Sequence, residues 1–330
     1  MAARKRANIP SIKAIFMIPV FIGVYCGIVL MSMIGRKRQA VSLFARLQQS
    51  PRLKRQAFQG YQPTARDVLV CTYSKSGTYW MLQIAYQIAQ RGQGEFEHIH
   101  DVVPWPDAPM PSIVGLRDEA TYAEATGLRV IKTHLESEYV PYSPDAKYIV
   151  VTRDPKEAFV SSYFFTSNMM PPSMMVSAPE WLDLFLSNQF QYGSWAAHIA
   201  GYWPWRTRPN VLMLTYDQML ADPPGTVRRV AAFMGVALTE AELALVVEKS
   251  SFGYMKAIDR KFVPQPPPPI KTRQVMMRKG ARGGSSELLT PAQQAQIDRF
   301  VQAELRRLQS DYPYADTFTV VDQAQPVATA

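Results

Sequence analysis

The chain has 330 residues, of which 47% are hydrophobic and 19% are charged, so it can bury the core of one large domain and still carry an extension. The net charge of +9 comes entirely from residues 1–66, which hold 12 lysines and arginines and no acidic residue. The remainder has 24 basic and 27 acidic residues, and this slightly acidic balance argues against a nucleic-acid-binding protein. The two cysteines, Cys26 and Cys71, suggest neither a disulfide framework nor a zinc cluster, which fits a reducing compartment.

The first feature along the chain is an apolar segment, residues 14–34, which has 21 residues and no charge. As a helix that rises about 1.5 Å per residue, it is long enough to cross a hydrocarbon core of about 30 Å. A cleaved signal peptide is the alternative. The segment is longer than the usual apolar part of such a peptide, however, and a basic run from Arg36 to Arg38 follows it in place of a cleavage site. We therefore predict an uncleaved, single-pass membrane anchor.

Basic residues flank this predicted anchor unequally, because four precede it and seven follow it within about twenty residues. The side with more positive charge usually remains cytoplasmic, so we expect the main domain in the cytoplasm. The predicted organisation is a basic tail (1–13), a transmembrane helix (14–34), a basic juxtamembrane segment able to lie against anionic lipid (35–66) and the main domain (67–330).

Four short β-rich runs mark the main domain, at residues 68–72, 129–132, 148–152 and 211–215. Helical patterns separate or follow them. Residues 222–224 open a helix that Gly235 ends, Thr239 and Glu242 form a capping box, and Thr290 with Pro291 opens the last long helix. This order predicts an α/β fold, with a central parallel sheet flanked by helices on both faces.

The stretch CTYSKSGTYW, residues 71–80, lies between the first strand and the helix that follows it. At such a turn, the first backbone N–H groups of the helix are unpaired and can bind a phosphate. Gly77 permits the turn, and Lys75, Ser76 and Thr78 add a positive charge and hydroxyl donors. The plain alternative is a capped helix beside a surface lysine. An ordinary ATP- or GTP-binding P-loop is disfavoured because its glycine precedes the lysine, so we predict a related, P-loop-like phosphate site.

A second candidate phosphate site follows the third strand. Arg153 ends the strand and Ser161 lies a little over two helical turns further on, so both can bind one phosphate. In isolation, Arg153 and Asp154 could equally be a surface ion pair. The second strand ends with Lys132 and His134, two residues apart. The carboxyl ends of parallel strands meet at one edge, so we expect the three segments to converge on one ligand.

These motifs resemble the sulfotransferases that use 3′-phosphoadenosine-5′-phosphosulfate (PAPS), especially the cytosolic type that acts on small molecules. The family's loop for the 5′-phosphosulfate, usually Y-P-K-S-G-T-T-W, is matched by YSKSGTYW, with Ser74 replacing proline and Tyr79 replacing threonine. The family's 3′-phosphate element matches Arg153, Lys156, Glu157 and Ser161, and its catalytic K-T-H matches residues 132–134. Further matches are YGSW (192–195), TYDQM (215–219), SSFGYM (250–255) and RKG (278–280), and the resemblance spans about residues 67–308.

The resemblance implies PAPS as co-substrate, adenosine 3′,5′-bisphosphate (PAP) as product and no metal. The residues that match the family's donor site are Lys75, Ser76, Gly77 and Thr78 for the 5′-phosphosulfate; Arg153, Ser161, Arg278, Lys279 and Gly280 for the 3′-phosphate; Trp80, Tyr216 and Phe252 for adenine; and Tyr79 and Ser251 beside them. The sequence departs from the family after RKG. There Gly284, Ser285 and Ser286 replace an acid, a tryptophan and a lysine, so loop closure and the oligomeric state stay open.

The implied reaction is in-line sulfuryl transfer to a hydroxyl or an amine. His134 is the expected general base, and Lys75 and Lys132 are expected to stabilise the transferring group in place of a metal ion. The segments expected to line the acceptor site, residues 104–114, 164–175 and 254–275, are rich in Met, Pro and aromatic residues, which favours a small lipophilic acceptor or a lipid. Two alternatives remain open: a nucleotide-dependent kinase of related fold, and a catalytically silent, membrane-anchored nucleotide-binding protein.

Overall fold

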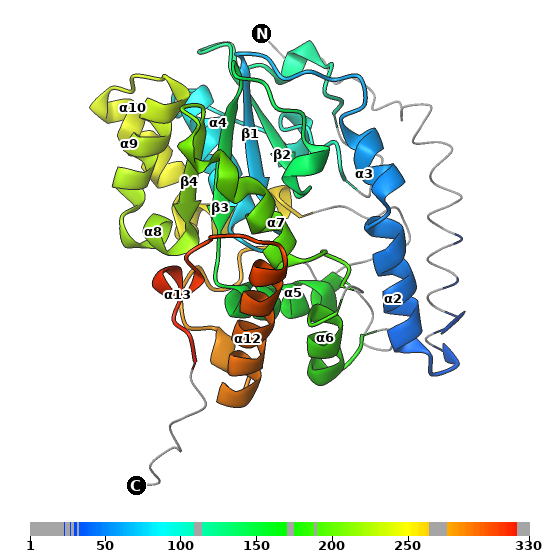
Figure 1. Ribbon diagram of the computed structural model, residues 1–330. Coiled ribbons are helices and arrows are strands. Elements are labelled where there is room, and N and C mark those ends of the chain that lie inside the picture. Colours follow the sequence, from blue (N-terminus) through cyan, green and yellow to red (C-terminus); the bar gives the residue numbers. More distant parts are fainter. Residues whose placement is uncertain are drawn as a thin grey trace, which may run out of the picture.

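The computed structural model describes residues 33–108, 114–169, 175–187, 190–263 and 276–321, together with positions 23, 27, 30 and 31. Figure 1 shows a central sheet with helices around it. In chain order, the strands and α-helices are α2 (Lys37–Gln48), α3 (Pro51–Ala57), β1 (Asp67–Thr72), α4 (Thr78–Ala89), β2 (Arg129–Thr133), β3 (Lys147–Thr152), α5 (Pro155–Met169), α6 (Ala178–Phe185), α7 (Trp195–Tyr202), β4 (Val211–Thr215), α8 (Tyr216–Ala221), α9 (Pro223–Met234), α10 (Glu240–Lys249), α11 (Phe252–Ala257), α12 (Pro291–Arg307) and α13 (Tyr314–Thr317).

The four strands form one parallel sheet in the order β2-β1-β3-β4. All four predicted strands are present, and each boundary lies within one residue of its prediction. The register pairs Cys71 with Thr133 and with Val150, so the carboxyl ends of β1, β2 and β3 lie side by side. The chain leaves β1 toward β2 and then returns across β1 to β3. The crevice between β1 and β3 is therefore the topological switch point, where such sheets bind ligands.

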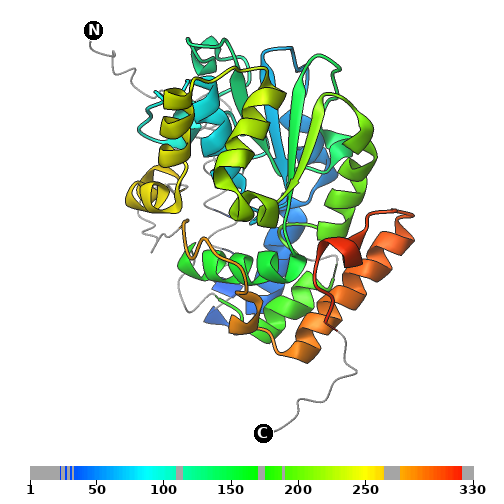
Figure 2. The ribbon, with the colours of Figure 1, turned by 90° about the vertical axis from the view of Figure 1, so that its left-hand side faces the viewer.

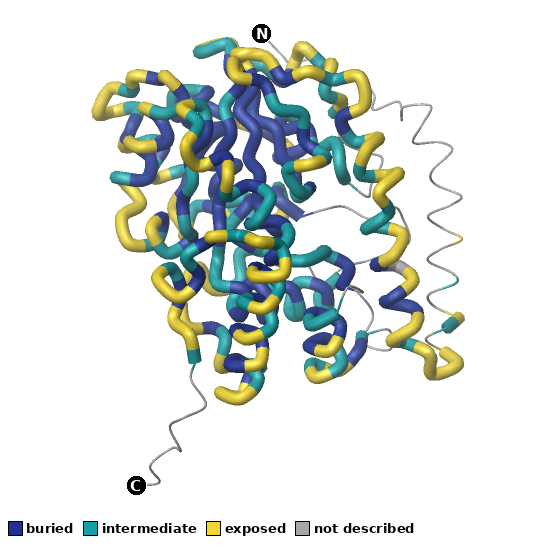
Figure 3. Tube along the Cα trace, in the orientation of Figure 1, coloured by how far each residue is buried: buried dark blue, intermediate teal, exposed yellow. Residues whose placement is uncertain are grey.

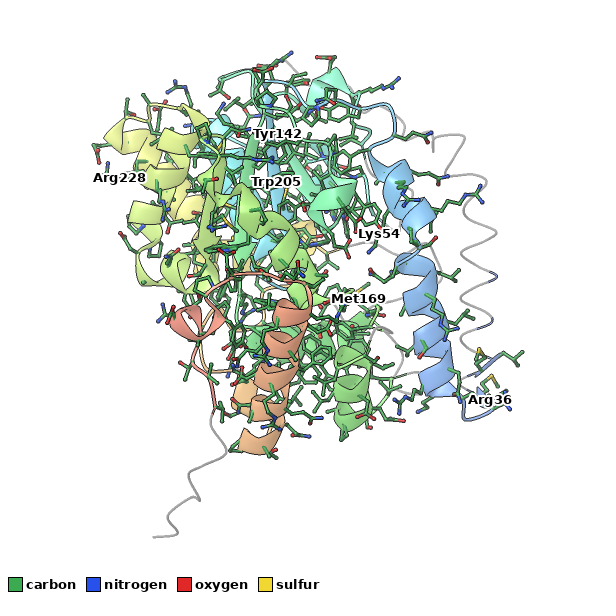
Figure 4. All side chains as sticks on the ribbon, viewed as in Figure 1. Arg36, Lys54, Tyr142, Met169, Trp205 and Arg228 are labelled. Atoms are coloured by element: carbon green, nitrogen blue, oxygen red, sulfur yellow. The ribbon has the colours of Figure 1, made fainter. Side chains whose placement is uncertain are left out.

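Alternate residues of each strand pack into different layers, because successive side chains point to opposite faces. On β1, Val68 and Val70 face the core under α4, α9 and α10, whereas Leu69 and Cys71 face the core that contains Tyr202, at the end of α7, and Trp205. Tyr142 and Trp205 close this second face with ring centroids 5.2 Å apart (Figure 4). The strands are buried almost throughout (Figure 3), which explains why they read as short, nearly continuous apolar runs.

The predicted helix ends are also confirmed. Asp222 caps α9 with its side chain, and Gly235 ends that helix with φ +76°. Capping boxes open α10 at Thr239 and α12 at Thr290. These ends could be predicted because they depend on contacts within one helical turn.

Helices α5, α6 and α12 form a second layer beyond the carboxyl ends of the strands (Figures 1 and 2). The basic segment before β1 also belongs to the folded body. Ala40, Val41 and Ala45 form the buried side of α2, and Lys54 of α3 contacts Glu136 with its Nζ 2.7 Å from Oε1 (Figure 4). Residues 37–57 therefore form two short helices that pack against the main domain.

No helix among the described residues is long and apolar enough to span a bilayer. Most of the predicted anchor, residues 14–34, lies outside the residues that the structure describes.

Candidate active site

The loop between β1 and α4 has a backbone suited to a bound anion. Lys75 has φ +69° and Gly77 has φ +87°, so the chain takes two left-handed positions within three residues. A Cβ on Gly77 would lie 2.6 Å from Cδ2 of Tyr216, so glycine is required there by contact as well as by conformation. Ser76 is fully buried, and its Oγ has no hydrogen-bond partner among the described residues. Because no side chain caps α4, its first N–H groups are free to bind the same anion.

Arg153 connects this loop to the end of β3. Its Nη1 donates to the backbone oxygen of Lys75 at 3.2 Å, and its guanidinium lies 4.3 Å from the ring centroid of Tyr216. Nε of Arg153 is buried without a hydrogen-bond partner in the described part of the chain. Ser76 Oγ and Arg153 Nε are therefore two buried donors that have no partner among the described residues and that border the switch point, where they can bind a phosphorylated ligand.

The ammonium of Lys75 lies among apolar groups and other cations. Its Nζ is 3.7 Å from Sδ of Met276 and 3.9 Å from the ring centroid of Phe165. Burial, and then the positive charges of Arg153 and Arg278, lower the pKa of Lys75 to about 7. An incoming anion would reverse this effect by stabilising the charged amine.

His134, directly after β2, is held in one tautomer. Its Nδ1 lies 2.8 Å from the backbone oxygen of Thr72. A carbonyl oxygen can only accept, so Nδ1 carries the proton and Nε2 keeps its lone pair. The backbone N–H of His134 donates to Oδ2 of Asp107 at 2.9 Å, which fixes the residue further. Burial, followed by the charge of Lys132, lowers the pKa of His134 well below its usual range, so the imidazole is neutral near pH 7.

Lys132 is 1% exposed, and its ammonium lies between two aromatic rings. Nζ is 3.2 Å from the ring centroid of Trp105 and donates to the hydroxyl of Tyr79 at 3.1 Å. Burial lowers the pKa of Lys132 well below its usual range, and the nearby carboxylate of Asp107 opposes this effect. Tyr79 is the only hydrogen-bond partner of Nζ within the described segments, so the remaining protons can contact a ligand.

The remaining predicted donor residues all lie in the part of the chain that the structure describes. Trp80 packs edge-on against Tyr216 with centroids 5.7 Å apart, and Phe252 is 42% exposed beside Gly280, where a Cβ would overlap its ring. Ser251 caps α11, and Ser161 lies half-buried on α5. Thr78 shares a hydrogen bond of 2.6 Å with Thr72 at the start of α4.

Arg278 and Lys279, the predicted 3′-phosphate residues, both contact one carboxylate. Nη1 of Arg278 is 2.6 Å from Oε2 of Glu287, and Nζ of Lys279 is 2.7 Å from Oε1 of the same residue. Glu157 likewise accepts from Arg153 and from the backbone N–H of Ser285. Each of these cations therefore has an acidic neighbour, and Arg278 lies close enough to Lys75 to lower the pKa of that lysine.

Sequence reasoning missed Trp105, Asp107 and Glu287 as individual site residues. The backbone N–H of Lys132 donates to the oxygen of Pro104 at 2.8 Å, which holds this loop against the edge strand and brings Trp105 and Asp107 to the site. No spacing in the sequence signals this contact. Segments 109–113, 170–174 and 264–275 of the expected acceptor walls lie outside the described residues.

The switch point of the parallel sheet thus holds a P-loop-like turn, a cluster of cations, and buried donors that have no partner within the described ranges. This combination defines a site for a phosphorylated ligand. No group of three or more potential metal ligands occurs in the described ranges.

Comparison with known proteins names the class more closely. Residues 65–309 match the family model of the sulfotransferase domain. The chain is 31% identical over 269 residues to Sulfotransferase 1C2 of Oryctolagus cuniculus, which covers 77% of this chain and 88% of the relative. It is 30% identical over 263 residues to 3-alpha-hydroxysteroid sulfotransferase of Cavia porcellus, with 78% and 89% covered. Its fold is similar to that of retinol dehydratase in complex with retinol and PAP, with a TM-score of 0.62, 19% identity, and 80% and 88% covered.

The chain therefore belongs to the sulfotransferase family and is a PAPS-dependent sulfotransferase. This confirms the predicted reaction class. The alternative of a kinase is set aside, because the family match covers the phosphate loop and all four strands.

Proposed function

We propose that this enzyme transfers the sulfuryl group of PAPS to a hydroxyl, or to an amine, of a small lipophilic molecule, with His134 as the general base. The observation that carries the proposal is the tautomer of His134, because the hydrogen bond from Nδ1 to Thr72 leaves the Nε2 lone pair as the proton acceptor. As the acceptor oxygen bonds to sulfur, Nε2 takes its proton, and the bond from sulfur to the bridging oxygen breaks to release PAP.

The lysines stabilise the charge that moves during this transfer. Lys75 lies in the anion-binding loop, and Lys132 is held at the end of the neighbouring strand β2. In the proposal, their ammonium groups stabilise the transferring group and the oxygen that departs. The unpaired donors Ser76 Oγ and Arg153 Nε hold the phosphates of the nucleotide, and Arg278 and Lys279 bind its 3′-phosphate.

A lipophilic acceptor is favoured by the groups around the base and the lysines. Trp105 lies edge-on to His134 with centroids 5.5 Å apart, and Phe165 covers Lys75. A polar sugar would find few hydrogen-bond partners on such surfaces. The names of relatives point the same way, since they include a hydroxysteroid sulfotransferase and a protein bound to retinol. Mass spectrometry of lipid extracts incubated with enzyme and labelled PAPS would identify the acceptor.

Replacing His134 by Ala tests the proposed base. The change removes the proton acceptor but no proposed nucleotide contact, so turnover with a verified acceptor should fall about 10²-fold or more while PAP affinity changes little. His198→Ala is the matched control, because His198, 3% exposed on α7, is another histidine whose pKa is lowered by burial. It should keep turnover. Full turnover in His134→Ala would refute the assignment of the base.

We further propose that residues 14–34 anchor the enzyme in a membrane with its catalytic domain in the cytoplasm. The charge distribution supports this, and so does the surface of α2, where Leu43 and Leu47 are exposed beside Arg46. Arg36 and Arg38 are exposed at the start of the same helix, where Figure 4 labels Arg36. The full chain should stay with membranes after carbonate extraction, and protease added outside right-side-out cells should spare the domain. Release into the soluble fraction would refute the anchor.

A further inference from the structure

A chain of buried hydrogen bonds leads from Lys132 through Tyr79 to His100. Nζ of Lys132 is 3.1 Å from the hydroxyl of Tyr79, that hydroxyl is 3.1 Å from Nε2 of His100, and Nδ1 of His100 is 3.0 Å from the backbone oxygen of Val103. The members come from β2, from α4 and from the short 3₁₀ helix Ile99–Asp101. His100 is 2% exposed, so the chain is closed to solvent at its far end.

Only one arrangement of protons satisfies these contacts with a charged Lys132. The carbonyl oxygen of Val103 accepts, so Nδ1 of His100 carries a proton. Burial lowers the pKa of His100 well below its usual range, so the ring is neutral and Nε2 must accept. The hydroxyl of Tyr79 therefore donates its proton to His100, and it can only accept from Lys132. The chain ends at a carbonyl, so it carries no proton to solvent. Its effect is to keep a lone pair of Tyr79 directed at the ammonium of Lys132.

Aromatic packing holds this chain in place. The ring of Trp105 lies over His100 with centroids 5.2 Å apart and planes 31° apart, and the same ring faces Nζ of Lys132 at 3.2 Å. Tyr79 meets His100 and Phe262 edge-on, with centroids 5.7 Å and 6.0 Å apart. Nζ is thus enclosed between the Tyr79 hydroxyl and the Trp105 face, both of which favour a cation.

We propose that Tyr79 and His100 are positioning residues that hold the ammonium of Lys132 in place and in its charged form during sulfuryl transfer. The proposal rests on the role assigned to Lys132 above. Burial and then the charge of Lys75 lower the pKa of Lys132, and the carboxylate of Asp107 opposes them. The lone pair of Tyr79 acts in the same direction as Asp107, because it accepts a stronger hydrogen bond from the charged amine than from the neutral one. His100 acts through Tyr79, because it accepts the hydroxyl proton and so keeps that proton from pointing at Lys132. The threonine usual at position 79 in this family has a shorter side chain, so this chain of contacts depends on the tyrosine.

The test is the pH profile of turnover in Tyr79→Phe, which keeps the ring and removes the hydroxyl. Lys132 acts when protonated, so losing the lone pair should move the alkaline limb of kcat to lower pH by about one to two units, while the affinity for PAP stays within about threefold. A naphthol and a hydroxysteroid serve as probe acceptors. Tyr86→Phe is the matched control, because Tyr86 is also on α4 and is 5% exposed, and its hydroxyl donates to the backbone oxygen of Glu95 at 3.0 Å.

A second pair of variants tests the chain if Tyr79→Phe folds poorly. His100→Leu removes the acceptor of the Tyr79 proton and should shift the limb in the same direction, whereas His100→Gln can accept from Tyr79 and donate to Val103 and should restore the profile. Lys132→Met, measured in parallel, separates the two proposals. Wild-type turnover in Lys132→Met would refute the role of Lys132 itself. If Lys132→Met is inactive but Tyr79→Phe keeps the wild-type pH profile, the positioning role of Tyr79 and His100 is refuted and the role of Lys132 stands. The same conclusion follows if His100→Leu and His100→Gln have equal pH profiles.

Discussion

Nucleotide binding should be accompanied by proton uptake at Lys75. The pKa of this residue is lowered to about 7, first by burial and then by the charges of Arg153 and Arg278, so the free enzyme holds a largely neutral amine above that pH. The phosphate groups of PAP place negative charge in the same loop and should raise the pKa again. The amine then takes up a proton as the nucleotide binds. The structure fixes the direction of this proton exchange as uptake, because Lys75 has a lowered pKa in the free enzyme and is therefore partly neutral before the nucleotide binds.

The size of the effect follows from the pKa of about 7. At pH 8, about nine-tenths of the Lys75 side chains are neutral, so binding should take up about 0.9 proton at this site. At pH 6 the amine is already charged, and the uptake should be about 0.1 proton. The contribution of Lys75 therefore grows as the pH rises through 7.

Titration calorimetry in buffers of different ionisation enthalpy measures this uptake. Lys75→Arg is the matched control, because its guanidinium stays charged at every pH tested while the positive charge of the loop is kept. Protons exchanged by the 3′-phosphate or by Lys132 occur in both proteins, so the difference between them isolates Lys75. Equal uptake by the two proteins at pH 8 would refute the lowered pKa of Lys75.

Two further predictions concern the donor site. Glu287→Gln should tighten PAP binding about two- to tenfold and leave adenosine 5′-phosphate binding unchanged, because its carboxylate contacts both Arg278 and Lys279. Glu304→Gln, which loses an ion pair with Arg307 elsewhere, is the control in the same calorimetric titrations, and equal gains for both nucleotides would contradict the assigned 3′-phosphate site. Gly77→Ala should lose stability and at least tenfold in PAP affinity, because a Cβ there meets Tyr216 as well as a φ of +87°. Gly235→Ala has a similar φ of +76° with open space around its Cβ, so it should show only the backbone cost of about 1–2 kcal/mol in thermal unfolding.

Much of the fold and of the donor site follows from local patterns. The strands, the caps of α9, α10 and α12, and the turn around Gly77 each depend on residues within a few positions of one another. Such contacts form in the same way wherever the segment lies in the protein, so the sequence alone could predict them. The parallel sheet then implied that Lys75, His134 and Arg153 share one edge, because each directly follows or lies just beyond a strand end.

The surroundings of those residues were decided by tertiary structure. Lys132 meets Trp105 and Tyr79 because β2 pairs with β1 in one register and because the loop after Val103 folds along the edge of β2. Glu287 reaches Arg278 because the chain after residue 280 turns back on itself. These pairs join residues whose separation in the sequence carries no periodic signal. A contact of this kind exists only when whole elements have packed, so its charges, tautomers and pKa shifts can be read only from the folded molecule.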